Sequence, residues 1–421
     1  MKRSLLFLLV PALLLGSCVL IPSKSSSSPT TSTQPTSSST PTTTIPDPTS
    51  NTSDTSDSST DTSTSEDEPP VVTKQTISQI KTDAKVGEWV KFDATYLRAL
   101  TWTNEDLMYF ADANDYIWFR VPYANYSGYL ANRYRMKEYT VLGKLAEVNG
   151  VLEVQYSSQI TPQESVISLG DTYPLSYNEN NVATTVTGIA QIKAKSGQIT
   201  LNNKGHGVGE VVKFTSQVVQ TEYTDANIKA MVLDSDGNSV TVIGDGKKMV
   251  GQDDIGKIYT WVGIISIQTS IPAILGISCT YVSQSNTVDV SNATEVSPSA
   301  FKNYGLTSSK YTPLSNNDYF KLYKASGYLK NNSDITTSYN LGVVDTNTGS
   351  LSDNNISTKS VAGFYLVNYT GLDSLAYCPD IIVNNLGQNV KLTFYFSIRA
   401  YDTQNHIWEM FIIEDLIELA E

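Results

Sequence analysis

The stretch Val86–Phe92, which reads VGEWVKF, returns as Val208–Phe214, which reads VGEVVKF. Six of the seven letters match. A second stretch, Tyr139–Gly143 (YTVLG), is echoed at nearly the same separation by Tyr259–Gly263 (YTWVG). Two matched landmarks at one spacing indicate a duplicated domain, and the spacing is far too long for a solenoid repeat. We therefore expect successive copies of one small domain.

The first copy has the pattern of an all-β domain. Val90, Phe92 and Ala94 alternate with polar or aromatic neighbours, as a half-buried strand requires. Asn149-Gly150 is a strong hairpin signal between the last two expected strands. The expected strands after the opening one are 107–111, 116–121, 139–147 and 151–156, and residues 123–137 are expected to be irregular or helical.

Three strands, a connection that carries a helix, and two further strands form the order of an OB-fold, a five-stranded Greek-key barrel. The G-E-x-V-K-F opening, the strand Tyr116–Val121 and the strand Tyr139–Leu145 resemble the OB-type domains of secreted and surface proteins of bacteria. The resemblance implies an all-β chain of tandem small OB-like barrels. We expect three of them.

The later units repeat the pattern with decreasing clarity. The second is expected to have strands at 208–219, 228–233, 239–243, 257–268 and 273–282, and 182–192 is expected to begin a strand or a helix. The third is expected at 319–329, 341–346, 361–369, 390–401 and 407–413, with a short helix in 414–421. The expected domains are 71–165, 166–290 and 291–421.

The amino terminus has the pattern of a secretory signal. Lys2 and Arg3 precede an apolar run that is too short to span a membrane, and small residues follow it. Leu15-Gly16-Ser17-Cys18 resembles the lipobox of bacterial lipoproteins. The resemblance implies that residues 1–17 are removed and that Cys18 carries a diacylglyceryl anchor, which places the protein outside the cytoplasm on the cell membrane. The alternative is an ordinary cleaved signal with an incidental cysteine.

Residues 18–70 are expected to be a disordered stalk. From Ile21 to Pro70 the chain is nearly all Ser, Thr, Pro and Asp, with no aromatic residue. Such a composition buries too little apolar surface to offset the entropy of ordering. The expected role of this segment is to hold the folded part away from the membrane.

Composition limits the functional classes. The formal charge is -13, from 29 basic and 42 acidic residues, and no segment is basic enough to bind nucleic acid non-specifically. Cys279 and Cys378 fall in different expected domains, so we expect free thiols rather than a disulfide.

No catalytic or metal motif stands out in the sequence. The only histidines, His206 and His406, fall in different expected domains, and neither has a partner at catalytic spacing. Asp234-Ser-Asp236-Gly-Asn238, followed by Asp245, has the letters of a calcium loop, but its glycine is misplaced for one. We expect a hairpin turn there, no cofactor and no enzymatic activity.

The candidate ligand-binding face lies on the first barrel. If Ile117, Phe119 and Val121 face the core, then Tyr116, Trp118 and Arg120 face outward. OB-folds present aromatic side chains at this position to stack on bases or sugar rings. The remaining candidates are two residues on the same outward face, Trp89 and Lys91, and a basic rim of Arg133, Arg135 and Lys137. The alternative is that the second domain or the Tyr-rich segment 123–139 covers this face and makes it an internal seam.

Three hypotheses follow. The first is a non-catalytic binding protein for single-stranded nucleic acid or oligosaccharide. The second is a structural or adhesive surface protein whose barrels are spacers that contact other surface proteins. The third is a hydrolase accessory or an enzyme that uses carboxylates alone. The second barrel has Val240 and Thr241 where the first has Trp118, so it is expected to lack the site and to serve as a spacer or partner surface.

Overall fold

A computed structural model describes residues 71–102, 105–122, 135–156, 167–170, 177–203, 205–222, 229–244, 249–268, 271–301, 318–331, 339–347, 363–372, 378–402 and 407–420. These residues belong to one compact unit. The expected signal peptide, Cys18 and the stalk lie outside the described residues, as do Arg133 and most of the connection 123–137. Among the described helices, none is both long enough and apolar enough to cross a membrane.

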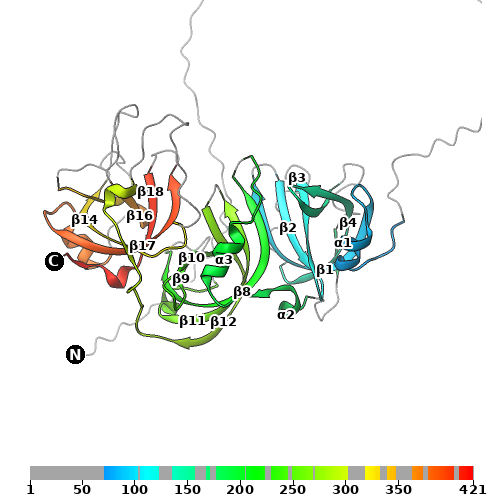
Figure 1. The fold of residues 1–421 in the computed structure, drawn as a ribbon, viewed down its shortest axis with the longest axis horizontal. Helices are drawn as coiled ribbons and strands as arrows, with labels where there is room; N and C mark the ends of the chain where they lie inside the picture. The colour runs from blue at the N-terminus through cyan, green and yellow to red at the C-terminus, as the bar shows by residue number, and fades with distance from the viewer. Residues whose placement is uncertain are drawn as a thin grey trace, which may run out of the picture. The chain divides into compact units, whose positions relative to one another are not determined.

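The first barrel contains the strands β1 (Trp89–Trp102), β2 (Glu105–Ala111), β3 (Tyr116–Pro122), β4 (Lys137–Val148) and β5 (Val151–Gln155) (Figure 1). They pair in the order β1-β2-β3-β5-β4, and β4 pairs back with β1 to close the barrel. Only the β3–β5 contact is parallel, and the others are antiparallel. This closed Greek-key order is that of an OB-fold. A short strand, β6 (Ile167–Gly170), adds to the edge of β4.

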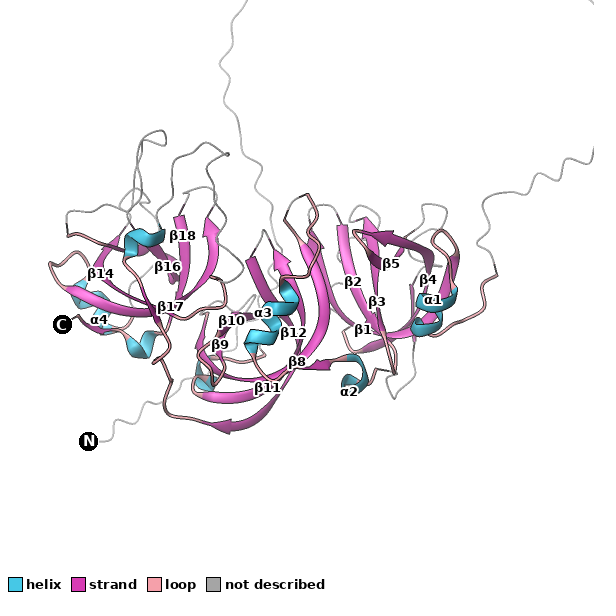
Figure 2. Ribbon diagram, viewed as in Figure 1, coloured by secondary structure: helices cyan, strands magenta, loops and turns pink. Residues whose placement is uncertain are grey.

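The second and third barrels repeat this topology. The second consists of β8 (Gly207–Thr221), β9 (Lys229–Leu233), β10 (Ser239–Ile243), β11 (Lys257–Gln268) and β12 (Ile271–Gln284). The third consists of β14 (Tyr323–Asn331), β15 (Tyr339–Val344), β16 (Gly363–Leu372), β17 (Lys391–Asp402) and β18 (Ile407–Ile412). Each closes through its first and fourth strands and has one parallel pair, between its third and fifth. The expected all-β chain with three tandem OB-like barrels is confirmed (Figure 2).

The two repeated sequence landmarks are neighbours across the closure of each barrel. Val90 pairs with Gly143 in the first barrel, and Val212 pairs with Gly263 in the second. A Cβ atom at Gly143 would lie 2.7 Å from the carbonyl oxygen of Gln155, and one at Gly263 would lie 2.7 Å from that of Leu275. The closing strand therefore requires glycine here, because the fifth strand passes too close for any side chain. This shared geometry accounts for the common spacing of the two landmarks.

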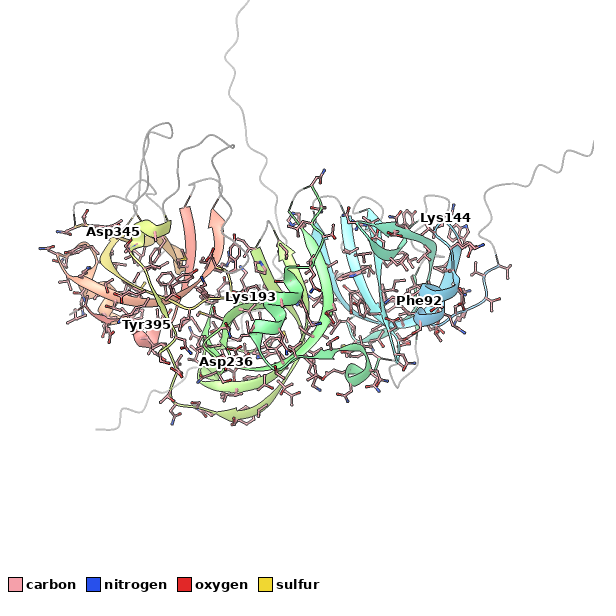
Figure 3. All side chains as sticks on the ribbon, viewed as in Figure 1. Phe92, Lys144, Lys193, Asp236, Asp345 and Tyr395 are labelled. Atoms are coloured by element: carbon pink, nitrogen blue, oxygen red, sulfur yellow. The ribbon has the colours of Figure 1, made fainter. Side chains whose placement is uncertain are left out.

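Phe92 and Phe214, the last residues of the repeated opening motif, hold the same place in their barrels. Phe92, labelled in Figure 3, is fully buried in the core of the first barrel, and Phe214 is 2% exposed in the core of the second. The alternation in the sequence thus correctly assigned the inward face of the opening strand.

A short lead-in precedes each barrel and pairs in parallel with its first strand. Lys74 forms a bridge with Lys91, while β7 (Thr184–Thr185) pairs with β8, and β13 (Thr294–Glu295) pairs with β14. A short helix then follows. These helices are α1 (Ile77–Asp83), α3 (Ile189–Ser196) and the 3-10 helix η2 (Pro298–Phe301). The expected strand or helix start at 182–192 is resolved into the end of α2 (Glu179–Val182), β7 and the start of α3.

One aspartate in each of the first two barrels joins the helix to a hairpin. Asp112 Oδ2 accepts the backbone N–H of Ile77 at 2.8 Å, and Asp234 Oδ2 accepts that of Ile189 at 2.7 Å. The other oxygen of each carboxylate accepts backbone N–H groups of its own turn, at Asn114 and at Asn238 among others. The letters that resemble a calcium loop therefore form a hairpin turn, as expected from the sequence.

The end of the chain differs from the expected short helix. The described residues 414–420 contain a 3-10 turn, η4 (Glu414–Leu416), and then a two-residue strand, β19 (Glu418–Leu419), which pairs with β17. The pattern of the sequence is ambiguous here because an apolar run this short fits both periods. Cys279 and Cys378 are free thiols, as expected, and burial raises the pKa of each.

Candidate functional site

Trp118, the centre of the expected ligand-binding face, is 2% exposed. The structure therefore contradicts the expectation that its indole is open to a ligand. Trp118 does point away from the interior of its own barrel, since it packs in a different cluster from Phe119 and the rest of that core. The orientation from the sequence was right, but another part of the chain covers this face.

The cover is the second barrel. One buried cluster, which we call the seam, combines outward-facing residues of both barrels. From the first barrel it contains Leu97, Leu100, Leu107, Tyr109, Ala111 and Trp118, and from the second Val211, Val262, Ile264, Leu275 and Ile277. The β1-β2-β3 face of the first barrel is thus packed against β8, β11 and β12 of the second. The alternative of an internal seam is confirmed.

Aromatic rings fill the centre of the seam. Tyr109 lies edge-to-face with Trp118 at a centroid distance of 4.6 Å and stacks on Tyr116 at 5.0 Å. Burial raises the pKa of Tyr109 well above its usual value and raises that of Tyr116 to about 12. Both phenols are therefore neutral at physiological pH. Lys81 lies over the Tyr116 ring at 4.3 Å and covers its outer side.

Two arginines connect the barrels through backbone oxygens. Arg98, which is 5% exposed, follows a bulge in β1 and donates to the carbonyl oxygens of Ile243, Gly244 and Gly276 at 2.6–2.9 Å. Arg135 donates to Leu97 O and to Ile277 O, both at 2.7 Å. Arg135 was expected on the rim of a ligand site, but its guanidinium is used to hold the two barrels together.

Arg120 is paired within the first barrel. Its guanidinium makes a two-pronged contact with the Glu153 carboxylate, at 2.6 Å from Nε and 2.8 Å from Nη2. The Glu153 side chain is only 3% exposed. This geometry is the strong, bidentate form of an ion pair. The expected outward position of Arg120 is correct, but its charge is neutralised.

Trp89 and Lys91 lie away from Trp118. Trp89 is half-buried against the core of the first barrel, with the Lys144 ammonium 5.3 Å from its ring centre. Both residues pair with β4, whereas Trp118 pairs with β2 and β5. The sequence placed them on one outward face, but the curvature of a closed barrel directs them to different parts of its surface.

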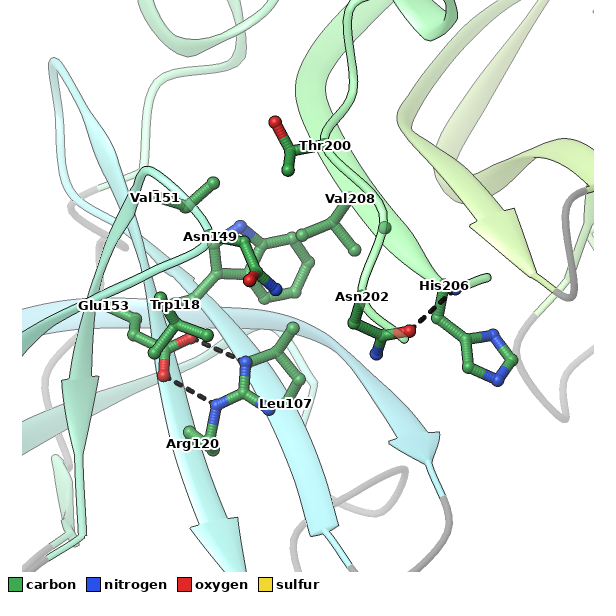
Figure 4. A pocket seen from close by; sticks show the side chains of 12 residues that line it. Leu107, Trp118, Arg120, Asn149, Val151, Glu153, Thr200, Asn202, His206 and Val208 are labelled. Carbon is green, nitrogen blue, oxygen red and sulfur yellow. Dashed lines mark hydrogen bonds and ion pairs between the residues drawn. The ribbon is translucent and has the colours of Figure 1, made fainter. Parts of the chain in front are cut away.

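A cleft of about 180 Å³ opens at one edge of the seam (Figure 4). Trp118 and Leu107 line it from the first barrel, together with the Arg120–Glu153 pair and the β4–β5 hairpin. The second barrel contributes the segment before β8, with Thr200, Asn202 and His206. The volume equals the space of roughly six water molecules, which suits a single ring-sized group.

The sequence did not identify the second barrel's side of this cleft. Thr200 is exposed, while Asn202 and His206 are half-buried. The Asn202 side chain accepts the backbone N–H of His206 at 3.0 Å, and Gly205 adopts a positive φ of 73° in the turn between them. The letters Asn202 to Gly207 indicated only a loop. Nothing in them shows which neighbour that loop meets, because the meeting depends on the packing of two barrels.

No family model matches the chain, and no curated protein is similar to it in sequence. Solved structures with some similarity include a murine DNA-binding protein bound with double-stranded DNA, which is 13% identical over 46% of this chain and 98% of that one, with a TM-score of 0.22. The HINa domain of Ifi202, in complex with 20-bp double-stranded DNA, is 14% identical over 46% and 96%, with a TM-score of 0.22. The p204 HINb domain is 11% identical over 45% and 95%, also with a TM-score of 0.22. Similarity at this level carries no conclusion about what this chain binds.

Proposed function

We propose that this chain is a lipid-anchored extracytoplasmic protein that binds a ligand without catalysis, and that one ring of an oligosaccharide enters the cleft beside Trp118. The observation that carries this proposal is the lining of the cleft. Beside the buried Trp118, the apolar side chains of Leu107, Val151 and Val208 line the cleft together with the polar groups of Arg120, Glu153 and Asn202. Apolar surface with a few fixed polar groups is typical of small-ligand sites.

Charge favours a sugar over a nucleic acid as the ligand. Among the described residues that line the cleft, Arg120 is the one Lys or Arg side chain, and Glu153 neutralises it, while Lys204 lies outside the described residues. Arg98 and Arg135 are used on backbone oxygens within the seam. Phosphate binding depends on unneutralised Lys and Arg side chains. Single-stranded nucleic acid is therefore the second-ranked ligand.

The anchoring belongs to the same proposal. The lipobox-like Leu15-Gly16-Ser17-Cys18 and the Ser/Thr/Pro-rich segment that follows support a tether through a diacylglyceryl group on Cys18. Metabolic labelling with a palmitate analogue tests this directly. Label on the wild-type chain and none on Cys18→Ala is the expected result, and label on neither would contradict the anchor.

Binding is tested by calorimetric titration of the full chain with neutral oligosaccharides and with an oligo-dT strand. Thr200→Trp places an indole in the cleft from an exposed position, and Gln198→Trp, on the same segment but outside the lining, is the matched control. We expect Thr200→Trp to weaken sugar binding about tenfold or more, a loss of about 1.4 kcal/mol. Binding of the oligo-dT strand, with an affinity that falls steeply as salt is added, would favour nucleic acid instead. An unchanged affinity of Thr200→Trp would contradict the site.

The seam also favours a second function, that of a structural spacer. The face that an OB-fold offers to ligands is used here to join two barrels, and a second buried cluster joins residues of the second and third barrels. Joined barrels would act as one stiff element. Small-angle scattering of the full chain and of Arg98→Met tests this. If the barrels form a stiff spacer, the distribution of interatomic distances should be broader for Arg98→Met than for the wild-type chain.

A further inference from the structure

A larger groove lies on the second barrel, outside the seam. Its volume is about 750 Å³, within the range of about 300–1,000 Å³ that is typical of ligand sites. The lining comes from the lead-in before α3, from β8, from the β9–β10 hairpin and from the segment that follows β12. The lining residues are Thr187, Thr215, Ser216, Gln217, Leu233, Asp234, Ser235, Ile258, Ser285, Thr287, Val288 and Asp289.

The chemistry of the groove is that of hydroxyl and amide groups. Of the lining residues that the structure describes, six are serines or threonines, one is a glutamine, and none is a lysine or an arginine. Two carboxylates, of Asp234 and Asp289, also line it. An anionic ligand such as a phosphate chain would meet negative charge with no compensating cation among the described lining residues. A neutral ligand with many hydroxyl groups would instead find both donors and acceptors.

Ser216 lies beneath the groove, with its side chain out of reach of a ligand. The residue is 3% exposed, and its Oγ is sealed from solvent. The equivalent residue of the first barrel, Ala94, faces the core of that barrel. The hydroxyl groups available to a ligand are therefore those of the exposed or half-exposed lining, which are Thr187, Thr215, Ser235, Ser285 and Thr287.

The walls of the groove are fixed before any ligand arrives. Gln217 Nε2 donates to the carbonyl oxygens of Gly256, Ser285 and Thr287, each at 3.2 Å, and so holds the segment after β12 along β8. Asp234 fixes the hairpin and the start of α3 on the other side. A pre-formed site loses less entropy when it binds.

The first barrel has different chemistry at the equivalent positions. Asp93 stands where the second barrel has Thr215, and Ala94 stands where it has Ser216. Asp93 is occupied by the Lys74 ammonium at 2.7 Å and by the Thr140 hydroxyl at 2.5 Å. At the same place in the second barrel, the Thr215 and Thr260 hydroxyls contact each other at 3.1 Å. The two copies therefore share their backbone, but where the first has the paired carboxylate of Asp93 the second has the hydroxyl of Thr215.

From this geometry we infer that the groove on the second barrel is a binding site for a neutral polysaccharide segment, separate from the cleft beside Trp118. The duplicated first barrel provides its control. Ser235 is exposed on the hairpin that borders the groove, and Ala113 is the equivalent exposed residue of the first barrel. Ser235→Trp fills the groove from outside, whereas Ala113→Trp adds the same side chain to a barrel without this lining.

The experiment is titration of the full chain with neutral hexasaccharides of glucose, xylose and N-acetylglucosamine, followed by hydrogen exchange of the complex. We expect one of them to bind, to protect residues 215–217 and 285–289 from exchange, and to bind Ser235→Trp about tenfold more weakly than Ala113→Trp. Ser216→Ala, which has the residue of the first barrel, should fold normally and bind with unchanged affinity, because the Ser216 Oγ is buried beneath the groove. Added salt should change little, because no ion pair with the ligand is formed.

The result that would overturn the groove proposal differs from the result that would overturn the cleft beside Trp118. Protection confined to residues 200–206, with normal binding by Ser235→Trp and loss by Thr200→Trp, would leave the cleft as the sole site. Protection at the groove that persists in Thr200→Trp would support the groove alone. If none of the three sugars binds, the groove proposal is wrong in its ligand class.

Discussion

Replacing Trp118 by alanine tests the seam most directly. The residue is 2% exposed and contacts residues of both barrels in one buried cluster. A buried aromatic side chain removes about 150–250 Å² from water. At about 25 cal/mol per Å², this contributes about 4–6 kcal/mol. Measured truncations of Phe and Trp in cores cost about 3–5 kcal/mol, because the surroundings relax in part. We expect a loss of about 4 kcal/mol.

The assay is thermal and urea unfolding of the full chain, followed by tryptophan fluorescence and calorimetry. A loss of this size corresponds to a fall in melting temperature of roughly 10 °C for the barrels that share the seam. Tyr281→Ala is the matched control, since Tyr281 is also an aromatic on a strand but is 55% exposed. The control should change stability by less than about 0.5 kcal/mol.

A Trp118→Ala chain that melts within about 1 °C of the wild type would refute this reasoning. In that case the two barrels separate in solution and the aromatic face is open. A loss of stability together with unchanged sugar binding would instead keep the seam and remove Trp118 from the ligand site. The two measurements therefore separate a packing role from a binding role.

Three further predictions concern buried charges. Arg120→Leu leaves the Glu153 carboxylate buried and unpaired, so it should cost about 3–5 kcal/mol in urea unfolding, whereas the double variant with Glu153→Leu should recover most of this. An equal loss of stability in the single and the double variant would argue against a buried Arg120–Glu153 ion pair. Burial raises the pKa of Glu222 from 4.5 to about 6, so the folded state retains a proton that the unfolded state releases. The free energy of unfolding should therefore fall by about 2 kcal/mol as the pH rises through this window, and Glu222→Gln should lack this part of the pH dependence. Asp234→Ala removes the link between the hairpin and α3 and should cost about 1–3 kcal/mol, with faster amide exchange at Ile189 as the local sign. Unchanged exchange there would contradict the proposed link.

Local patterns were enough to predict the strands. Alternation along 89–94, the Asn149-Gly150 turn and the Asp236-Gly237 turn gave two barrels with boundaries close to those observed. The strands 239–243 and 257–268 were predicted to the residue. These features depend on side chains a few positions apart, which is the range that period and turn chemistry describe.

Long-range packing was beyond the same patterns. Alternation shows that Trp118 points away from its own core, but it does not show what covers the outer face. The cover comes from Val211, Val262 and Ile264, far along the chain. In the same way, Arg98 has no sequence signal for its role, because its partners are backbone oxygens of another barrel.

The amino-acid sequence by itself determined the class of fold, the duplication and the turn at Asp234, because each depends on neighbouring residues or on a repeated local motif. Only the tertiary structure decided which surfaces remain available. In the folded chain the second barrel covers the aromatic face of the first, and Arg98 and Arg135 donate hydrogen bonds from one barrel to the other. A groove lined by hydroxyl groups remains accessible on the second barrel. The physical reason is that exposure is a property of what packs against a surface, and in this chain the packing partners are separate barrels.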